Sequence, residues 1–129
     1  MSAMYKPDGY STVSPYLIVE RADATITFLR QAFGAEELRR FAGESGRLMH
    51  AEVRIEDTVV MLADAPGGQA IPAHVHLYVQ EVDAVYQRAL DAGATSVQEP
   101  MEKGGDDPDR RGGVQDVGGT TWWISTGGA

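Results

Sequence analysis

The chain has 129 residues, is 43% hydrophobic, contains no cysteine and carries a formal charge of −8 at pH 7. This length suits one domain with a sizeable core, and the missing cysteine excludes disulfides, thiolate metal sites and cysteine nucleophiles. Nucleic-acid binding needs clustered Lys and Arg, so this acidic composition predicts no nucleic-acid partner. No stretch approaches the ~18 apolar residues of a membrane span, and no basic-then-apolar signal pattern opens the chain. We therefore expect no membrane partner and a cytoplasmic location.

The first half of the chain predicts a strand, a helix and three further strands. After a polar lead-in, an apolar stretch at 13–19 is the first strand. Apolar residues at helical spacing predict a helix over 22–33, with Asp23 as its N-cap and Gly34 in the left-handed position after it. The remaining strands are expected at 37–41, 48–55 and 58–63, with a two-residue hairpin turn at Glu56-Asp57 between the last two.

The second half repeats this order after a linker at 66–72, whose Pro and Gly content marks it as a connection. A charged, glycine-containing loop is expected at 102–111. The other predicted elements are a strand at 75–79, a helix at 82–92, and strands at 96–99, 113–116 and 121–125.

The two halves also match residue by residue at a spacing of sixty. Leu17 matches Leu77, and Asp23 matches Asp83. Such a repeat predicts two βαβββ modules in an α+β architecture, with helices outside a curved sheet that surrounds a cavity. We expect a single domain over 11–126, with module 1 at about 11–65, the linker at 66–72 and module 2 at about 73–126.

Strand alternation assigns side chains to faces. Val75, Leu77 and Val79 suit the face under a helix, which leaves His74, His76 and Tyr78 on the opposite, concave face. By the repeat, Ser14, Tyr16 and Ile18 share that hollow. The hairpin turn places Glu52 opposite Met61, Arg54 opposite Val59 and His50 opposite Ala63. This register predicts that all three histidines point into one cavity.

Several segments resemble the vicinal oxygen chelate superfamily, which includes glyoxalase I, bleomycin-resistance proteins and extradiol dioxygenases, and within it the PhnB-like branch. The resemblance runs from about Ser11 to Thr126. Relatives commonly have Asp-Pro-Phe-Gly before the paired tryptophans, whereas this chain has Asp116-Val-Gly-Gly119, so we expect a softer turn. The matching segments are Phe28-Leu-Arg-Gln-Ala-Phe-Gly-Ala-Glu-Glu37, Met49-His-Ala-Glu-Val53, Val59-Val-Met-Leu-Ala-Asp64, Asp109-Arg-Arg-Gly-Gly-Val114 and Thr121-Trp-Trp-Ile124.

The resemblance implies a divalent metal held by one side chain from the first and last strand of each module. Ser14, Met61, His74 and Trp123 occupy these positions, and only His74 is a usual ligand. We therefore expect no metal cofactor, and a non-catalytic protein that binds a planar aromatic or antibiotic-like molecule, with Trp123 stacking on it. The resemblance also implies a homodimer. The expected ligand-binding residues are Ser14, Tyr16, Glu52, Met61, His74, His76, Tyr78 and Trp123.

The alternative is a metal-dependent lyase, isomerase or dioxygenase of the same superfamily. Its Zn, Ni or Fe ion would be held by His74 and His76 with Glu52 or His50. If no metal binds, we expect the histidines to be hydrogen-bonded polar residues that line a water-filled cavity. Glu52 is either a general base or the ion-pair partner of Arg54.

One further residue and one pair also leave alternatives open. Trp123 either floors the cavity or fills a collapsed one, whereas Trp122 belongs to the core. Arg110-Arg111 is either an anion site or a solvated pair.

Overall fold

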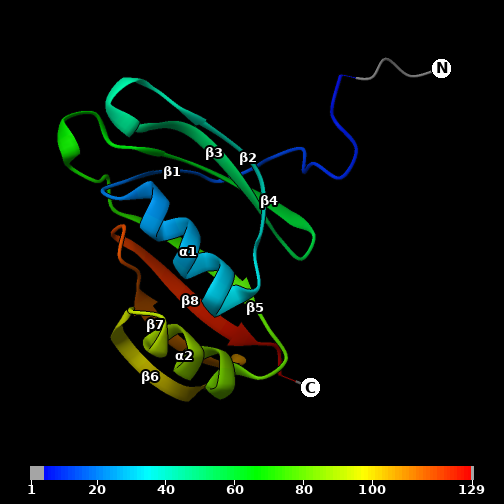
Figure 1. The fold of residues 1–129 in the computed structure, drawn as a ribbon. Coiled ribbons are helices and arrows are strands. Elements are labelled where there is room, and N and C mark those ends of the chain that lie inside the picture. The colour runs from blue at the N-terminus through cyan, green and yellow to red at the C-terminus, as the bar shows by residue number, and fades with distance from the viewer. Residues whose placement is uncertain (1–4, 129) are drawn as a thin grey trace.

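The computed structural model describes residues 5–128. Module 1 contains β1 (Tyr16–Val19), α1 (Ala22–Phe33), β2 (Glu36–Ala42), β3 (Leu48–Ile55) and β4 (Thr58–Asp64), with one 3₁₀ turn at Glu44–Gly46 and another after β4 at Pro66–Gly68. Module 2 contains β5 (Ala73–Tyr78), α2 (Val82–Asp91), β6 (Thr95–Gly104), β7 (Asp107–Gln115) and β8 (Thr120–Thr126). The repeated strand–helix–strands order is confirmed (Figure 1).

Each module builds its own four-stranded sheet. The strand orders are β1-β4-β3-β2 and β5-β8-β7-β6, and the first two strands of each order run parallel. The predicted α+β fold of two βαβββ modules is therefore confirmed, but the sheets stay separate and do not close around one cavity within the chain.

The helices lie on the inner faces of the two sheets. α1 contacts β3, β2 and β4, α2 contacts β7, β6 and β8, and the helices contact each other. In Figure 1, α1 lies between the first sheet and β8. One hydrophobic core joins both modules, and within it the Phe33 and Trp122 rings are 5.0 Å apart. Trp122 is thus a core residue, as predicted, and the two helix-free faces lie on opposite sides of this core.

Helix α1 has the predicted bounds, and Gly34 follows it with φ of 69°. The predicted N-cap at Asp23 is wrong. The helix instead begins after Arg21, and the N–H of Ala22 donates to the side chain of Asp64 on β4 at 2.7 Å. The second oxygen of Asp64 accepts the N–H of Leu48 at 2.8 Å, so one carboxylate joins the helix start to two strands.

The predicted loop at 102–111 is also wrong. These residues form the end of β6 and the start of β7, joined by a turn in which Gly104 and Gly105 have positive φ. Opposite charges face each other across this hairpin, since Glu102 is paired with Arg110 in the register. The polar sequence therefore forms a strand pair held partly by ion pairs between its charged side chains.

The turn at 116–119 is held firmly rather than softened. The buried side chain of Asp116 accepts the N–H groups of Gly118 and Thr120 and the indole N–H of Trp122. A Cβ at Gly118 would lie 2.3 Å from Thr25 Oγ1, so only glycine lets this turn approach α1.

No helix among residues 5–128 has the length and apolar character needed to cross a membrane.

Candidate functional site

The helix-free faces of the sheets carry equivalent rows of side chains. In the first sheet the row is Tyr16, Met61, Glu52 and Arg39; in the second it is His76, Trp123, Gly113 and Gln98. The predicted pairings of Glu52 with Met61 and of Arg54 with Val59 are confirmed. We call these two helix-free surfaces the first and second open faces.

Glu52 is the centre of the first open face. Although only 5% exposed, its carboxylate has three partners, which are the Tyr10 hydroxyl, His50 Nε2 at 2.7 Å and Arg39 Nε at 3.0 Å. The expected pair with Arg54 is wrong, because the Arg54 guanidinium lies 3.3 Å from the carboxylate of Glu36.

The pKa of Glu52 reflects opposing effects. Burial of the carboxyl raises the pKa, but hydrogen bonds from Tyr10 and His50 and the positive charge of Arg39 outweigh it and hold the pKa below its ordinary value. Glu52 is therefore a buried carboxylate in its ionised form at neutral pH. It acts on its neighbours as an acceptor and a negative charge.

His50 joins Glu52 to Tyr16. Its Nδ1 lies 2.9 Å from the Tyr16 hydroxyl, on the side of the ring opposite the contact with Glu52. The rings of Tyr16 and Phe41 lie 5.5 and 6.2 Å from the imidazole. The segment before β1 covers part of this face, because the Tyr10 hydroxyl bonds Glu52 and the carbonyl of Gly9 accepts a bond from Arg54.

Trp123 is the centre of the second open face. Its indole N–H donates to His74 Nδ1 at 3.0 Å, and the two rings are nearly parallel, with 8° between their planes. The six-membered ring lies over Gly113, where a Cβ would come within 2.6 Å of it. Trp123 and His74 thus form one flat aromatic surface on the sheet, which we call the aromatic platform.

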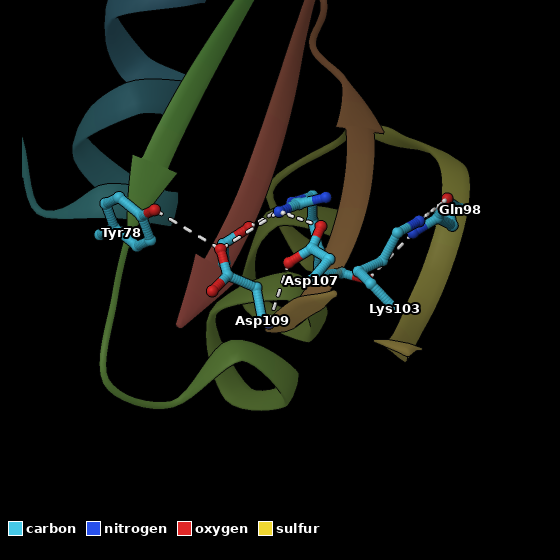
Figure 2. Close-up of polar contacts among 7 residues, drawn as sticks. Tyr78, Gln98, Lys103, Asp107 and Asp109 are labelled. Carbon is cyan, nitrogen blue, oxygen red and sulfur yellow. Dashed lines mark hydrogen bonds and ion pairs between the residues drawn. The ribbon is translucent and has the colours of Figure 1, made fainter. Parts of the chain in front are cut away.

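A charged cluster borders this platform. Figure 2 shows the Tyr78 hydroxyl directed at Asp109, with Asp107 two residues before it on the same strand, β7. Arg111 bonds both aspartates and the Ser125 hydroxyl, and is mostly buried. Arg110 pairs with Asp83 and Glu102. The two arginines are therefore neither a simple solvated pair nor free to bind an anion, because both already have carboxylate partners.

The structure does not bring the three histidines into one cavity of a single chain. His50 belongs to the first open face, whereas His74 and His76 belong to the second and lie beside Trp123 and Tyr78 respectively. Within the described range 5–128, no group of three or more His, Asp or Glu side chains is arranged to hold a metal ion.

The four positions that the resemblance assigns to a metal do not fit one. Ser14 shares a hydrogen bond with Ser11, Met61 offers only a thioether, and the Trp123 indole has no lone pair to donate. The lone pair of His74 Nδ1 accepts the Trp123 N–H, so the proton of the neutral His74 ring is on Nε2. Neither ring nitrogen of His74 then has a free lone pair for a metal ion unless the hydrogen bond to Trp123 breaks. The expected absence of a metal cofactor stays a prediction that rests on this donor chemistry.

Two grooves that sequence reasoning missed lie where the β3–β4 hairpin meets β5. They measure about 740 and 500 Å³, and Ile55, Glu56, Leu77 and Tyr78 line both. His76 lines the smaller groove. Their walls come from different modules, so no local sequence pattern signals them.

A family model matches nearly the whole chain. The model of the Glyoxalase/Bleomycin resistance protein/Dioxygenase superfamily matches residues 11–124. An uncharacterised protein of Mycobacterium bovis is 44% identical in an alignment 97 residues long, with 66% of this chain and 64% of that protein covered. The chain thus spans less than two thirds of the length of this relative.

Solved structures show the same fold. TioX from Micromonospora sp. ML1 superposes with a TM-score of 0.74 at 24% identity, covering 91% of this chain and 98% of TioX. The fosfomycin resistance protein FosX from Listeria monocytogenes, crystallised with Mn(II) and sulfate, gives a TM-score of 0.70 at 18% identity, with 91% and 90% covered. At these identities the likeness extends to the fold alone.

Proposed function

The chain belongs to the glyoxalase/bleomycin resistance protein/dioxygenase superfamily, and from this premise we propose that it binds a planar aromatic, antibiotic-like molecule on its second open face. Binding there is by stacking and does not transform the ligand. The observation that carries this proposal is the aromatic platform of Trp123 and His74, laid flat on the sheet by Gly113.

The platform suits flat ligands for two physical reasons. An aromatic ligand stacks on an indole at little cost in side-chain entropy when the indole is already fixed, and the His74 hydrogen bond and the close contact with Gly113 fix Trp123. His76 and Tyr78, exposed on the neighbouring strand β5, extend the aromatic surface toward the smaller groove.

Charge favours cationic over anionic ligands. The whole chain carries −8, and the arginines nearest the platform are already paired with carboxylates. A cation over the indole face gains roughly 0.5–2 kcal/mol. Among ligands of equal aromatic area, the proposed order of affinity is cation, then neutral molecule, then anion.

A second copy of the chain completes the pocket in this proposal. The open faces lie on opposite sides of one core and expose Tyr16, Phe41, Tyr78 and Met101, each about half exposed or more. A homodimer that sets the first open face of one copy against the second face of the other would shelter these side chains. Sedimentation velocity tests this, and a monomer at micromolar concentration would contradict it.

Three finer expectations remain predictions. They are membership of the PhnB-like branch, a cytoplasmic location and the absence of a metal cofactor. Metal analysis of protein purified without an affinity tag checks the last. One equivalent of zinc, nickel or iron per chain, lost in His74→Ala, would instead support the metal-dependent alternative.

Titration calorimetry with three naphthalene compounds tests the stacking proposal. The probes are 1-naphthylmethylammonium, 2-naphthol and naphthalene-2-sulfonate, which differ in charge. Trp123→Ala is expected to weaken binding of the cation by about tenfold or more, and Trp123→Phe by less, because a smaller ring remains. Equal affinity of wild type and Trp123→Ala for all three probes would refute the proposed site.

A further inference from the structure

Equivalent hairpins of the two modules have turns of different length. The β7–β8 turn has four residues, 116–119, whereas the β3–β4 turn has only two, Glu56-Asp57. The longer turn reaches over module 1, where Gly118 packs closely against Thr25 and Val19. The shorter turn leaves the equivalent part of module 2 open, and the larger groove, of about 740 Å³, lies there.

The repeat shows which side chains this groove leaves uncovered. Under the long turn, Leu17 and Val19 are 3% and 1% exposed. Their counterparts sixty residues later, Leu77 and Val79, are only partly buried and line the groove. The groove therefore exposes apolar surface that the first module buries. A ligand with an apolar body would cover this surface in place of the longer turn.

Arg88 on α2 supplies a positive charge at the wall of the groove. Its Nε donates to the carbonyl of Ala32, in the last turn of α1, at 2.8 Å, and this bond holds the guanidinium across the boundary between the modules. Within residues 5–128 the two terminal nitrogens of Arg88 have no hydrogen-bond or ion-pair partner. They remain available to a carboxylate, which a guanidinium binds through two parallel N–H groups.

Glu81 supplies a negative charge on the same side of α2. It lies seven residues before Arg88, which corresponds to two helical turns and about 10 Å along the axis. Ala84 and Val85 lie between the two charges and also line the groove. Glu56, on the facing hairpin, adds a second carboxylate. The groove thus combines an apolar floor with separated charges of both signs.

We propose that the larger groove binds a linear aliphatic zwitterion, which has a carboxylate at one end, an ammonium group at the other and a hydrocarbon chain between them. The carboxylate binds the terminal nitrogens of Arg88, the ammonium group lies at Glu81, and the chain covers Leu77 and Val79. Charge complementarity favours this occupant over a fatty acid, because the glutamates and the net charge of −8 repel a pure anion. The groove is separate from the aromatic platform, so this inference goes beyond the stacking function.

Titration of ¹⁵N-labelled protein with three compounds of one chain length tests the proposal. 8-Aminooctanoate carries both charges, octanoate only the carboxylate and octylamine only the ammonium group. 8-Aminooctanoate is expected to bind about fivefold more tightly than either of the others and to shift the backbone N–H signals of Val79, Ala84 and Arg88. Equal affinities for the three compounds, or shifts confined to other parts of the chain, would overturn the proposal.

Arg88→Gln tests the contact with the carboxylate. This variant is expected to bind 8-aminooctanoate about fivefold more weakly and octylamine as wild type does, because octylamine has no carboxylate. Arg88→Lys keeps the charge and should retain part of the affinity. Arg30→Gln is the matched control, since Arg30 is also in the last turn of a helix but lies outside the groove. An equal loss for both compounds in Arg88→Gln, or no loss, would contradict the assignment.

Ala84→Phe fills the groove and separates this site from the aromatic platform. Ala84 is exposed, so the helix accommodates the larger side chain. The variant is expected to lose 8-aminooctanoate binding and to bind 1-naphthylmethylammonium as wild type does, whereas Trp123→Ala is expected to do the reverse. Retained 8-aminooctanoate binding in Ala84→Phe would overturn the proposal. A wild-type dimer that dissociates in Ala84→Phe during sedimentation would also overturn it, since a second copy would then occupy the groove.

Discussion

The flat face of the Trp123 indole packs against the backbone of Gly113. These residues are paired between β8 and β7, and a Cβ at Gly113 would come within 2.6 and 2.8 Å of two carbons of the indole ring. At the equivalent place in module 1, Met61 is paired with Glu52. The same position of the repeat is therefore occupied by the buried carboxylate of Glu52 in the first sheet and by Gly113 in the second. Because Gly113 has no side chain, it leaves room for the Trp123 ring.

Gly113→Ala is expected to lift the indole and to lower the free energy of unfolding by about 1–3 kcal/mol, because the added methyl overlaps a ring held on both sides. The affinity of Gly113→Ala for 1-naphthylmethylammonium should also be lower than that of wild type. Urea unfolding and calorimetry measure the two effects. Gly127→Ala is the control, since a Cβ there meets nothing within 4 Å. Unchanged affinity in Gly113→Ala would show that the flat orientation is not needed.

Gly118→Ala is expected to loosen the contact between the modules. The new Cβ would lie 2.3 Å from Thr25 Oγ1 and 2.9 Å from Val19 Cβ, so the turn must move away from α1 and β1. The expected loss is about 2–3 kcal/mol in the free energy of unfolding. Adding Thr25→Ala should recover part of it, because one of the two overlapping atoms is removed. A double variant no more stable than Gly118→Ala would argue against this contact as the cause.

Asp64 should matter more to helix α1 than Asp23 does. Asp64→Ala removes the acceptor for the N–H groups of Ala22 and Leu48 and is expected to cost about 1–2 kcal/mol. Asp23→Ala removes a charge in the first turn and the acceptor for one N–H group, that of Ala24, and is expected to cost less, about 0.5 kcal/mol. Thermal and urea unfolding of both variants give the comparison, and an equal cost would restore Asp23 as the cap.

Glu52 should contribute to the loss of stability in acid. Burial opposes ionisation, but the hydrogen bonds of Tyr10 and His50 and the charge of Arg39 leave the pKa of Glu52 below the ordinary value of 4.5. A carboxyl with a lowered folded pKa stabilises the fold above its unfolded pKa and ceases to do so as pH falls through the folded pKa. The stability of wild type should therefore fall below pH 4.5 more steeply than that of Glu52→Gln. Parallel curves from urea unfolding at each pH would contradict this.

Local patterns predicted the elements that have a regular hydrophobic period. Apolar residues at helical spacing and the following Gly34 placed α1 at its observed bounds, and the two-residue turn at Glu56-Asp57 placed β3 opposite β4 in the observed register. The hairpin of β6 and β7 was missed because its tip, Glu102 to Arg110, is polar on both faces and shows no alternation.

The contacts of the site depended on strand neighbours that the sequence does not reveal. Arg39 lies opposite Glu52 because the pairing of β2 with β3 shifts by one residue between Glu37 and Arg39, and such a bulge has no signature here. The residues predicted for the site were largely those on the open faces. Their division between two faces of one core was not foreseen, since the repeat alone does not say how the modules pack.

The two indole N–H resonances in a ¹⁵N–¹H correlation spectrum measure the proposed binding site directly. Trp122 is buried with its N–H bonded to Asp116, whereas the Trp123 N–H bonds His74 on the second open face. Adding 1-naphthylmethylammonium is expected to shift the Trp123 signal progressively to saturation and to leave the Trp122 signal in place. Saturable binding that moves neither indole signal, or only that of Trp122, would contradict a ligand site on the aromatic platform.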